Sequence, residues 1–381
     1  MYKRQLPKQN AREAAVVNNL KVYGVENIKE VIEFFNNERN LEPSIVNTRE
    51  EFYENQSSFP YDFADVKGQE SVKRALEVAA SGGHNLIMIG SPGSGKSMMA
   101  KCMPSILPPL SLGESLETTK IHSIAGKLGK DSSLIAIRPF RSPHHTISQV
   151  AMVGGGTNPQ PGEISLAHNG LLFLDELPEF NRSVLEVLRQ PLEDRYISIS
   201  RAKYSLDYPA SFMLVASMNP CPCGYYNHPT RACVCNPGQV QRYLNRISGP
   251  LLDRIDIQIE IVPVPFEKMA EQHHAESSAS IRKRVIKARK IQAQRFANHP
   301  GIYCNAQMEA GLLHLYAQPN EAGLKLLQTA MTRLNLSARA YGRILKVART
   351  IADLDNSEHI TSIHLAEAIS YRNLDREDWA G

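Results

Sequence analysis

Glycine, lysine and serine have a characteristic spacing in "LIMIGSPGSGKSMMAK", a stretch that begins at Leu86. Gly90, the four residues after it and the run Gly-Lys-Ser over 95–97 together match the pattern G-x-x-x-x-G-K-[ST] of a phosphate-binding loop. Glycines let backbone N–H groups surround phosphates, and the N-terminus of a following helix adds positive potential. We therefore expect Lys96 to contact the β- and γ-phosphates of ATP, and Ser97 to ligate Mg²⁺. The expected nucleotide contacts are Gly90, Ser91, Pro92, Gly93, Ser94, Gly95, Lys96, Ser97 and Met98.

Acidic residues follow a second apolar run, "LLFL", at Asp175 and Glu176. Downstream of a phosphate loop, the aspartate of such a pair holds the Mg²⁺ shell, and the glutamate can polarise an attacking water. A strand that simply ends in two surface acids is the alternative interpretation. A third apolar run, "FMLVASM", leads to Asn219, whose amide could orient that water or contact the γ-phosphate. The alternative for Asn219 is a turn-forming role before Pro220.

These residues need a scaffold, and the surrounding pattern predicts one. Four apolar runs, "NLIMIG", "GLLFLDE", "SFMLVASMN" and "IDIQIEI", alternate with helical stretches. Such runs indicate a parallel sheet that is covered by helices on both faces. A strand before Gly90 and a helix after Ser97 also favour a phosphate loop over a chance glycine-rich turn. The predicted fold class is therefore α/β, a parallel P-loop sheet flanked by helices.

The two ends of the chain differ from this sheet in pattern. After residue 265 the sequence becomes helical, most clearly in "SIRKRVIKARKIQAQRF", "NEAGLKLLQTAMTRL", "SARAYGRILKVARTIADL" and "TSIHLAEAISYR", several of them with Ser, Thr or Asn as the N-cap. Residues 1–60 are polar, with one amphipathic helix in "NIKEVIEFFNNE" and a linker after it. We predict three parts: 1–60, an α/β domain over 61–265, and a small all-helical domain over 266–381.

Composition narrows the class of protein. The 381 residues are 42% hydrophobic and 22% charged, which is ordinary for a globular protein, and the formal charge of +4 is too small to indicate nucleic acid by itself. No apolar run approaches ~18 residues, so we expect no membrane span. The N-terminus lacks the hydrophobic core of a signal peptide, so we expect a cytoplasmic protein. Six cysteines in such a chain indicate reduced thiols or a bound metal, and not a disulfide framework.

Several longer stretches together resemble one family. The stretches "DFADVKGQESVKRALEVAASGGHNLIMIGSPGSGKS", "GEISLAHNGLLFLDELPEF", "MNPCPCGYY", "RISGPLLDRIDI" and "LSARAYGRILKVARTIADL" resemble the magnesium-chelatase-like ComM/YifB family of AAA+ ATPases. The resemblance implies that 61–265 is the AAA+ domain and that 266–381 is its helical lid. It also implies that 1–60 is the remnant of an N-terminal domain similar to the Lon protease C-terminal domain, because "NAREAAVVNNLKVYGVENIKEV" resembles that domain's tail. The chain would then lack most of that domain.

The resemblance assigns roles to two arginines. Arg254, in "GPLLDRIDI", matches the arginine finger, which would reach the ATP of a neighbouring subunit and stabilise charge on the transferring phosphoryl group. A structural ion pair with Asp253 or Asp256 is the alternative. Arg339, in "LSARAYGR", matches the second sensor, although Arg343 lies on the same helical face, four residues later. An arginine supplied by a neighbour implies a ring, which we expect to be a homohexamer.

Four cysteines lie close together in "CPCGYYNHPTRACVC": Cys221, Cys223, Cys233 and Cys235. Two C-x-C pairs ten residues apart could close a tetrahedral Zn²⁺ site with four sulfur ligands and hold together a loop that has no obvious core. C-x-C is tighter than the usual C-x₂-C, and free thiols are the alternative. His228 is a possible substitute ligand.

Basic residues that could contact DNA lie in "DRYISISRAKYSLDYPA", where alternation predicts a hairpin with Arg201 and Lys203 near its bend. In related ring ATPases a hairpin at this place points into the pore, and a solvated turn is the alternative. The glycine-rich loop "MVGGGTNPQPGEIS" is a second candidate pore element. His144 and His145 are interpreted as loop residues, because no third metal ligand is evident, and the basic helix over 282–295 as a solvated face.

These observations predict an Mg²⁺-dependent ATPase that assembles into a ring and turns hydrolysis into mechanical work. The resemblance implies DNA as the load, since ComM-type proteins act as branch-migration helicases in natural transformation, with DNA bound by the full-length protein. The alternatives are a metal-chelatase-like or protein-remodelling motor, and a nucleotide-gated scaffold that hydrolyses slowly.

Overall fold

The computed structural model describes residues 2–15, 20–44, 52, 56, 59–129, 134–156, 159–201, 204–264, 275–334 and 336–372. The chain divides into two compact units, one made of Met1–Ser58 with Pro109–Arg138 and one made of Phe59–Pro108 with Pro139–Gly381. The predicted division at residues 60 and 265 stays a prediction. Among the described residues, no helix combines the length and the apolar composition that a membrane span requires.

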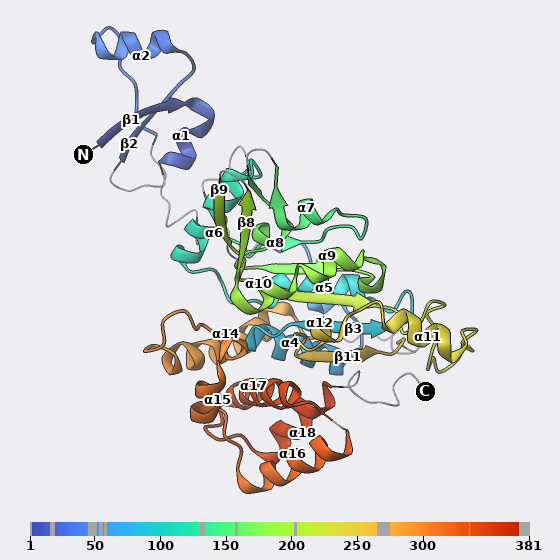
Figure 1. Ribbon diagram of the computed structural model, residues 1–381. Helices are drawn as coiled ribbons and strands as arrows, with labels where there is room; N and C mark the ends of the chain where they lie inside the picture. The colour runs from blue at the N-terminus through green and yellow to red at the C-terminus, as the bar shows by residue number, and fades with distance from the viewer. Residues whose placement is uncertain are drawn as a thin grey trace. The chain divides into compact units, whose positions relative to one another are not determined.

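The first unit contains a parallel pair of strands joined by a helix. Its elements are β1 (Tyr2–Pro7), α1 (Lys8–Ala14), β2 (Leu20–Val25), α2 (Ile28–Phe35) and α6 (Leu112–Ile124). β1 and β2 pair in parallel, and α1 lies beside them (Figure 1). The small core consists of Ala11, Ala15 and Val22. The sequence predicted α2, whose N-cap Asn27 accepts a hydrogen bond from the Glu30 backbone, but not the paired strands before it.

The second unit contains a five-stranded parallel sheet in the order β11-β3-β10-β7-β4. The strands are β3 (Leu86–Gly90), β4 (Phe140–Arg141), β7 (Leu171–Leu174), β10 (Met213–Met218) and β11 (Ile257–Ile261). The four predicted strands and their parallel arrangement are thus confirmed. The edge strand β4 was missed, because a strand of two residues leaves no apolar run in the sequence.

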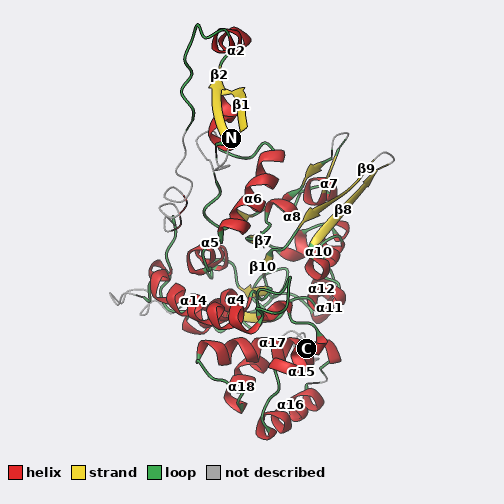
Figure 2. Ribbon diagram, turned by 90° about the vertical axis from the view of Figure 1, so that its left-hand side faces the viewer, coloured by secondary structure: helices red, strands yellow, loops and turns green. Residues whose placement is uncertain are grey.

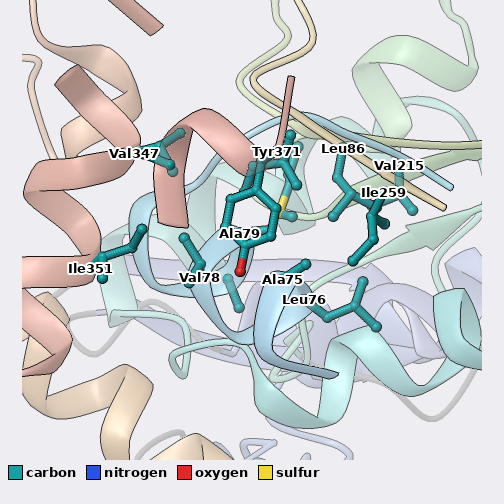
Figure 3. Close-up of a cluster of buried hydrophobic side chains, with 14 of the residues drawn as sticks. Ala75, Leu76, Val78, Ala79, Leu86, Val215, Ile259, Val347, Ile351 and Tyr371 are labelled. Atoms are coloured by element: carbon teal, nitrogen blue, oxygen red, sulfur yellow. The ribbon is translucent and has the colours of Figure 1, made fainter. Parts of the chain in front are cut away.

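Both faces of this sheet are buried. Along β3, Leu86 and Met88 belong to one hydrophobic core, whereas Ile87 and Ile89 belong to another. Successive side chains of a strand point to opposite faces, so a strand covered on both sides must be apolar throughout. Figure 3 shows the first core, in which residues of α4 (Glu70–Gly82) contact the sheet and the C-terminal helices. This sandwich fixes the carboxyl ends of the strands, where the candidate site lies.

The C-terminal region is helical, as predicted. Its helices are α14 (Ser278–Arg295), α15 (Ala310–Tyr316), α16 (Glu321–Arg333), α17 (Ala338–Leu354) and α18 (Ser362–Ser370). The side chains of Ser277, Asn320 and Ser337 accept hydrogen bonds at the starts of α14, α16 and α17. α14 and α17 pack on α4 and share the first core, so this region is joined to the sheet by a continuous apolar layer.

Shorter helices, strands and 3₁₀ turns complete the second unit. They include α5 (Lys96–Ile106), α7 (Gln149–Val153), β5 (Gly154–Gly155), β6 (Gln160–Pro161), α8 (Glu163–Leu166), α9 (Arg182–Glu186), α10 (Arg189–Asp194), α11 (Pro237–Leu244), α12 (Gly249–Leu252), and the 3₁₀ turns η2 (Phe63–Asp65), η3 (Leu177–Glu179) and η4 (Asn305–Gln307). β8 (Tyr196–Arg201) and β9 (Tyr204–Pro209) form the predicted antiparallel hairpin, a two-stranded ribbon in Figure 2.

Candidate functional site

The predicted phosphate loop connects β3 to α5 at the carboxyl end of a central strand. Gly90 must be glycine, because an added Cβ would lie 2.7 Å from the carbonyl oxygen of Ile261. Gly93 and Gly95 have φ angles of 77° and 88°, in the left-handed region that side chains rarely adopt. Gly95 is also the N-cap of α5, so the loop places the free N–H groups of an 11-residue helix at its mouth.

Lys96 is hydrogen-bonded to neutral oxygen atoms. Its Nζ donates to the carbonyl oxygens of Gly90 at 2.7 Å and Ser91 at 2.9 Å, and to Oδ1 of Asn219 at 3.3 Å. Burial lowers the pKa of Lys96, against the opposing effect of the nearby acids Asp175 and Glu176. Among the described residues no carboxylate forms a direct ion pair with Lys96, so the ammonium group has none to break before it can contact a phosphate.

Asp175 joins two neighbouring elements of the site. Its Oδ2 accepts a hydrogen bond from the Ser97 hydroxyl at 2.7 Å, and its Oδ1 accepts one from the Ser217 hydroxyl. The predicted Mg²⁺ ligands Ser97 and Asp175 are thus in direct contact across β7 and α5. Ser217 was missed by the sequence interpretation, although a lone hydroxyl in the apolar run of β10, two residues before Asn219, was a usable signal.

Glu176 lies just after β7 and has a strained backbone conformation. Its φ is 55°, its backbone N–H donates to Ser217 Oγ at 3.4 Å, and its side chain is exposed. The carboxylate lies 3.8 Å from Nδ1 of His145. The ring of His145 contacts those of His144 and Phe180. The sequence interpretation placed His145 in a loop and missed its proximity to Glu176. The two residues belong to different segments, one before β7 and one after it.

The residues present suit a nucleotide with Mg²⁺. A hydroxyl and a carboxylate are the oxygen ligands that Mg²⁺ prefers, and Ser97 and Asp175 supply them. Within the described residues, the buried Oγ of Ser94 has no hydrogen-bond partner, so one donor of the loop remains available to an oxyanion. Glu176 and Asn219 border the same region from β7 and β10. This arrangement can bind a triphosphate and activate a water beside it.

Arg254 is nearly buried and paired within its own chain. It is 9% exposed, its guanidinium donates to Glu193 and to the carbonyl oxygen of Pro250, and its Nε has no partner among the described residues. The alternative pairings with Asp253 or Asp256 are replaced by this one with Glu193, on α10. To reach a neighbouring subunit, the guanidinium must first leave Glu193, whose side chain is largely exposed.

The two candidate sensor arginines differ in their surroundings. Arg339 is exposed and pairs with Asp253 at 2.8 Å. Arg343 pairs at 2.8 Å with Asp256, which is 1% exposed and also lies 3.2 Å from Nδ1 of His84. Burial alone would raise the pKa of Asp256, but Arg343 and His84 outweigh it and the pKa is well below its usual range. Arg343 therefore has a structural partner, and Arg339 has the accessible guanidinium that a sensor needs.

The four predicted cysteines do come together. All four sulfur atoms lie within 4.8 Å of one another, and Cys221 is fully buried. Burial acts to raise the pKa of Cys223, but hydrogen bonds from the backbone N–H groups of Val234 and Tyr225 outweigh it and lower the pKa to about 6. His228, the suggested substitute ligand, instead accepts backbone hydrogen bonds from Thr230 and Arg231 at its Nδ1.

The candidate DNA contacts lie at the end of the β8–β9 hairpin. Arg201 is the last residue of β8 and pairs with Tyr204 through the backbone. Lys203 lies outside the described residues, as does the side chain of Arg201. Their role stays a prediction. In the glycine-rich loop, β5 and β6 form a short antiparallel pair, Gly154 facing Pro161.

Comparison with known families accounts for most of the chain. The family described as "Magnesium chelatase, subunit ChlI" matches residues 62–269, and "Magnesium chelatase, subunit ChlI C-terminal" matches residues 275–372. Together these matches cover the sheet with its phosphate loop and the helical region after it. The predicted magnesium-chelatase-like family and AAA+ fold are confirmed.

Individual relatives agree with this assignment. YifB of Salmonella typhimurium is 49% identical over 319 residues, 83% of this chain and 61% of that protein. The competence protein ComM of Haemophilus influenzae is 42% identical over 372 residues, 97% of this chain and 72% of that protein. The magnesium-chelatase 38 kDa subunit of Rhodobacter capsulatus is 25% identical over 179 residues, 42% of this chain and 50% of that protein. The chain thus spans about three fifths of the length of the YifB relative. It belongs to the magnesium-chelatase-like family of AAA+ ATPases, with ComM and YifB among its relatives.

Proposed function

We propose that this chain hydrolyses ATP with Mg²⁺ and that it does so as one subunit of a ring that moves DNA. The observation that carries the ATPase part is the convergence of Lys96, Ser97, Asp175 and Asn219 at the carboxyl ends of β3, β7 and β10. Ligands of parallel α/β sheets bind at this edge. Family membership supports the same activity.

Each side chain of the site has a distinct task in this proposal. Lys96 exchanges its carbonyl partners for phosphate oxygens, and the helix N-terminus behind it adds positive potential. Ser97 and Asp175 hold Mg²⁺, which when bound neutralises charge on the phosphates. Glu176 accepts a proton from the attacking water, and Asn219 orients that water.

The ring rests on the arginines. Arg254 acts as a finger on the ATP of the adjacent subunit, and Arg339 senses the γ-phosphate from the helical lid. Neither guanidinium is bonded to a residue of its own phosphate loop. A finger in trans requires a closed set of neighbours, and we propose a homohexamer.

DNA is the proposed load because the relative that covers the largest share of this chain among those described above is named a competence protein. The β8–β9 hairpin and the glycine-rich loop are the elements proposed to line the pore. The second candidate is a chelatase-like motor, which the likeness to a magnesium-chelatase subunit favours.

The test is ATP hydrolysis by the full chain, measured alone, with branched DNA, with linear duplex of the same length, and with Lys96→Ala protein as the blank. Stimulation that is greatest with branched DNA is expected. Hydrolysis that no DNA changes would exclude DNA as the load of this chain and favour the chelatase-like motor. Loss of hydrolysis in Lys96→Ala shows that the activity belongs to the protein and not to a contaminant.

A further inference from the structure

The segment between β10 and α11 has almost no apolar core. Residues 219–236 form no helix or strand, and Pro220, Cys221 and Gly224 are the residues buried in it. Val234 is 85% exposed. A loop of this length and composition needs another source of order, because backbone ordering is unfavourable and little apolar surface is buried in return. The sulfur cluster is the feature that could supply it.

The sulfur atoms have the spacing of a shared metal. Cys221, Cys223 and Cys233 have Sγ–Sγ separations of 3.3, 3.7 and 3.6 Å, and Cys235 completes the group. Four sulfur ligands at ~2.3 Å from a tetrahedral Zn²⁺ would be about 3.8 Å apart. All four cysteines are free thiols, so no disulfide accounts for their proximity.

Backbone donors surround the same sulfur atoms. The N–H of Cys235 points to Cys233 Sγ at 3.4 Å, and the N–H groups of Tyr225 and Val234 are hydrogen-bonded to Cys223. Hydrogen bonds from the protein backbone stabilise thiolate ligands and orient them in metal sites. A set of four sulfurs selects zinc or iron among common metals, and zinc is the one that structural sites of this kind use.

This cluster also touches the phosphate loop. Gly224, between the two cysteine pairs, has a φ of 83°, and a Cβ added there would lie 2.5 Å from Cδ of Pro92. On its other side the segment begins at Asn219, whose Oδ1 accepts the hydrogen bond of Lys96. The segment therefore contacts the nucleotide site both at Pro92 and at Asn219.

We propose that the four cysteines bind one Zn²⁺ and that the loop closed by this metal supports the phosphate loop, so that removal of the metal weakens nucleotide binding. The metal site stands on the sulfur geometry alone. The coupling rests on the proposed nucleotide site. In this coupling the metal acts by positioning the loop. It fixes the backbone of Gly224 against Pro92 and holds Asn219 where its side chain can contact Lys96.

The first measurement is metal content by elemental analysis, on the full chain purified under reducing conditions without chelator. About one zinc per chain is expected. Cys233→Ser should lose it, whereas Cys102→Ala, which removes a buried thiol outside the cluster, should retain it. Protein without metal that also fails to take up added zinc would overturn the site, and iron in place of zinc would overturn the choice of metal.

The second measurement is the affinity for a fluorescent ATP analogue, before and after zinc is removed by a thiol reagent and then restored. A loss of about ten-fold, recovered with zinc, is expected, since displacing a packed backbone contact has an effect of this size. Gly224→Ala should weaken binding to a similar extent while it retains zinc. Unchanged affinity in both the zinc-free protein and Gly224→Ala would overturn the coupling. If the untreated chain binds no nucleotide, the proposed function fails, and the zinc measurement still decides the metal site.

Discussion

The phosphate-loop side of the site and the arginine side hold their charged groups in different ways. Lys96 contacts two carbonyl oxygens and an amide, and Asp175 contacts two hydroxyls. Each candidate arginine is instead paired with an acid, namely Arg254 with Glu193, Arg339 with Asp253 and Arg343 with Asp256. Neutral partners exchange easily for a ligand, whereas an ion pair must first be broken. In the proposed function, the phosphate-loop side can bind nucleotide as it stands, whereas the arginine side must first break its ion pairs.

The largest effect is expected from Lys96→Ala. Lys96 is the cation placed at the phosphate loop, and its removal should abolish nucleotide binding or hydrolysis. The measurement is equilibrium binding of an ATP analogue together with steady-state hydrolysis. Lys101→Ala, at an exposed position of the same helix, is the matched control and should leave both unchanged. Near-normal turnover in Lys96→Ala would remove the assignment of this loop.

Arg254→Ala should leave ATP binding nearly intact and lower hydrolysis by roughly 10³-fold or more, the scale of an arginine finger. Mixing it with Lys96→Ala protein should restore some hydrolysis, since each variant supplies what the other lacks across an interface. Native mass spectrometry would show whether mixed rings form. Mixed rings without recovered hydrolysis at any ratio would contradict action in trans.

Glu193→Gln tests the role of the ion pair with Arg254, because the substitution keeps the shape of the side chain and removes its charge. If Glu193 only restrains the arginine, hydrolysis should be unchanged or faster. A loss as large as that of Arg254→Ala would instead show that Glu193 positions the guanidinium for its task.

Glu176→Gln should bind ATP and hydrolyse it about 10²- to 10⁴-fold more slowly, because an amide cannot accept a proton from water. Glu179→Gln, three residues on and also exposed, is the control and should retain activity. Single-turnover hydrolysis with bound ATP separates binding from chemistry. A Glu176→Gln protein that binds no ATP would show that this residue has a structural role.

His145→Ala tests whether the imidazole positions the carboxylate of Glu176, from which it lies 3.8 Å away. Slower hydrolysis with unchanged ATP affinity is expected.

Substitutions of Arg343 and Arg339 should have different effects, the first mainly on stability and the second mainly on ATP hydrolysis. Arg343→Ala leaves Asp256 buried without its arginine and should lower the free energy of unfolding by about 3 kcal/mol. Arg339→Ala removes an exposed ion pair, changes stability by less than about 1 kcal/mol, and should slow hydrolysis. Urea unfolding and ATPase assays measure the two effects. Equal stability losses in both variants would contradict the distinction.

The Asp256 pair also predicts a pH dependence. The pKa of Asp256 is lower in the folded state than in the unfolded chain, where it is about 4. The ionised carboxylate therefore stabilises the fold fully above about pH 4, and this stabilisation is lost as the pH falls below that value. The stability difference between the native protein and Arg343→Ala should therefore shrink below about pH 4.

Sequence patterns were informative where the chemistry is local. The phosphate loop, the acids after β7 and the capped helices of the C-terminal region can each be found within a few consecutive residues. The strand pair β1–β2 was missed, because its strands are partly polar and form no continuous apolar run. Contacts between distant segments were also missed: Glu193 with Arg254, His145 with Glu176, and Gly224 with Pro92. Each depends on how connections from different strands meet at one sheet edge, which no local pattern encodes.

The smallest expected effect on the ATPase site concerns the hairpin between β8 and β9. A motor that moves along DNA must contact mainly phosphates, since it cannot depend on one sequence. Replacing both Arg201 and Lys203 with Ala should weaken DNA binding and reduce the slope of log affinity against log salt by about two. Basal hydrolysis should persist, because neither residue belongs to the predicted nucleotide site, while stimulation by DNA should fall. The comparison variant replaces Lys283 and Lys287, two exposed residues of α14, with Ala. If that variant loses DNA binding and the hairpin variant does not, the DNA path runs along α14 and not along the hairpin.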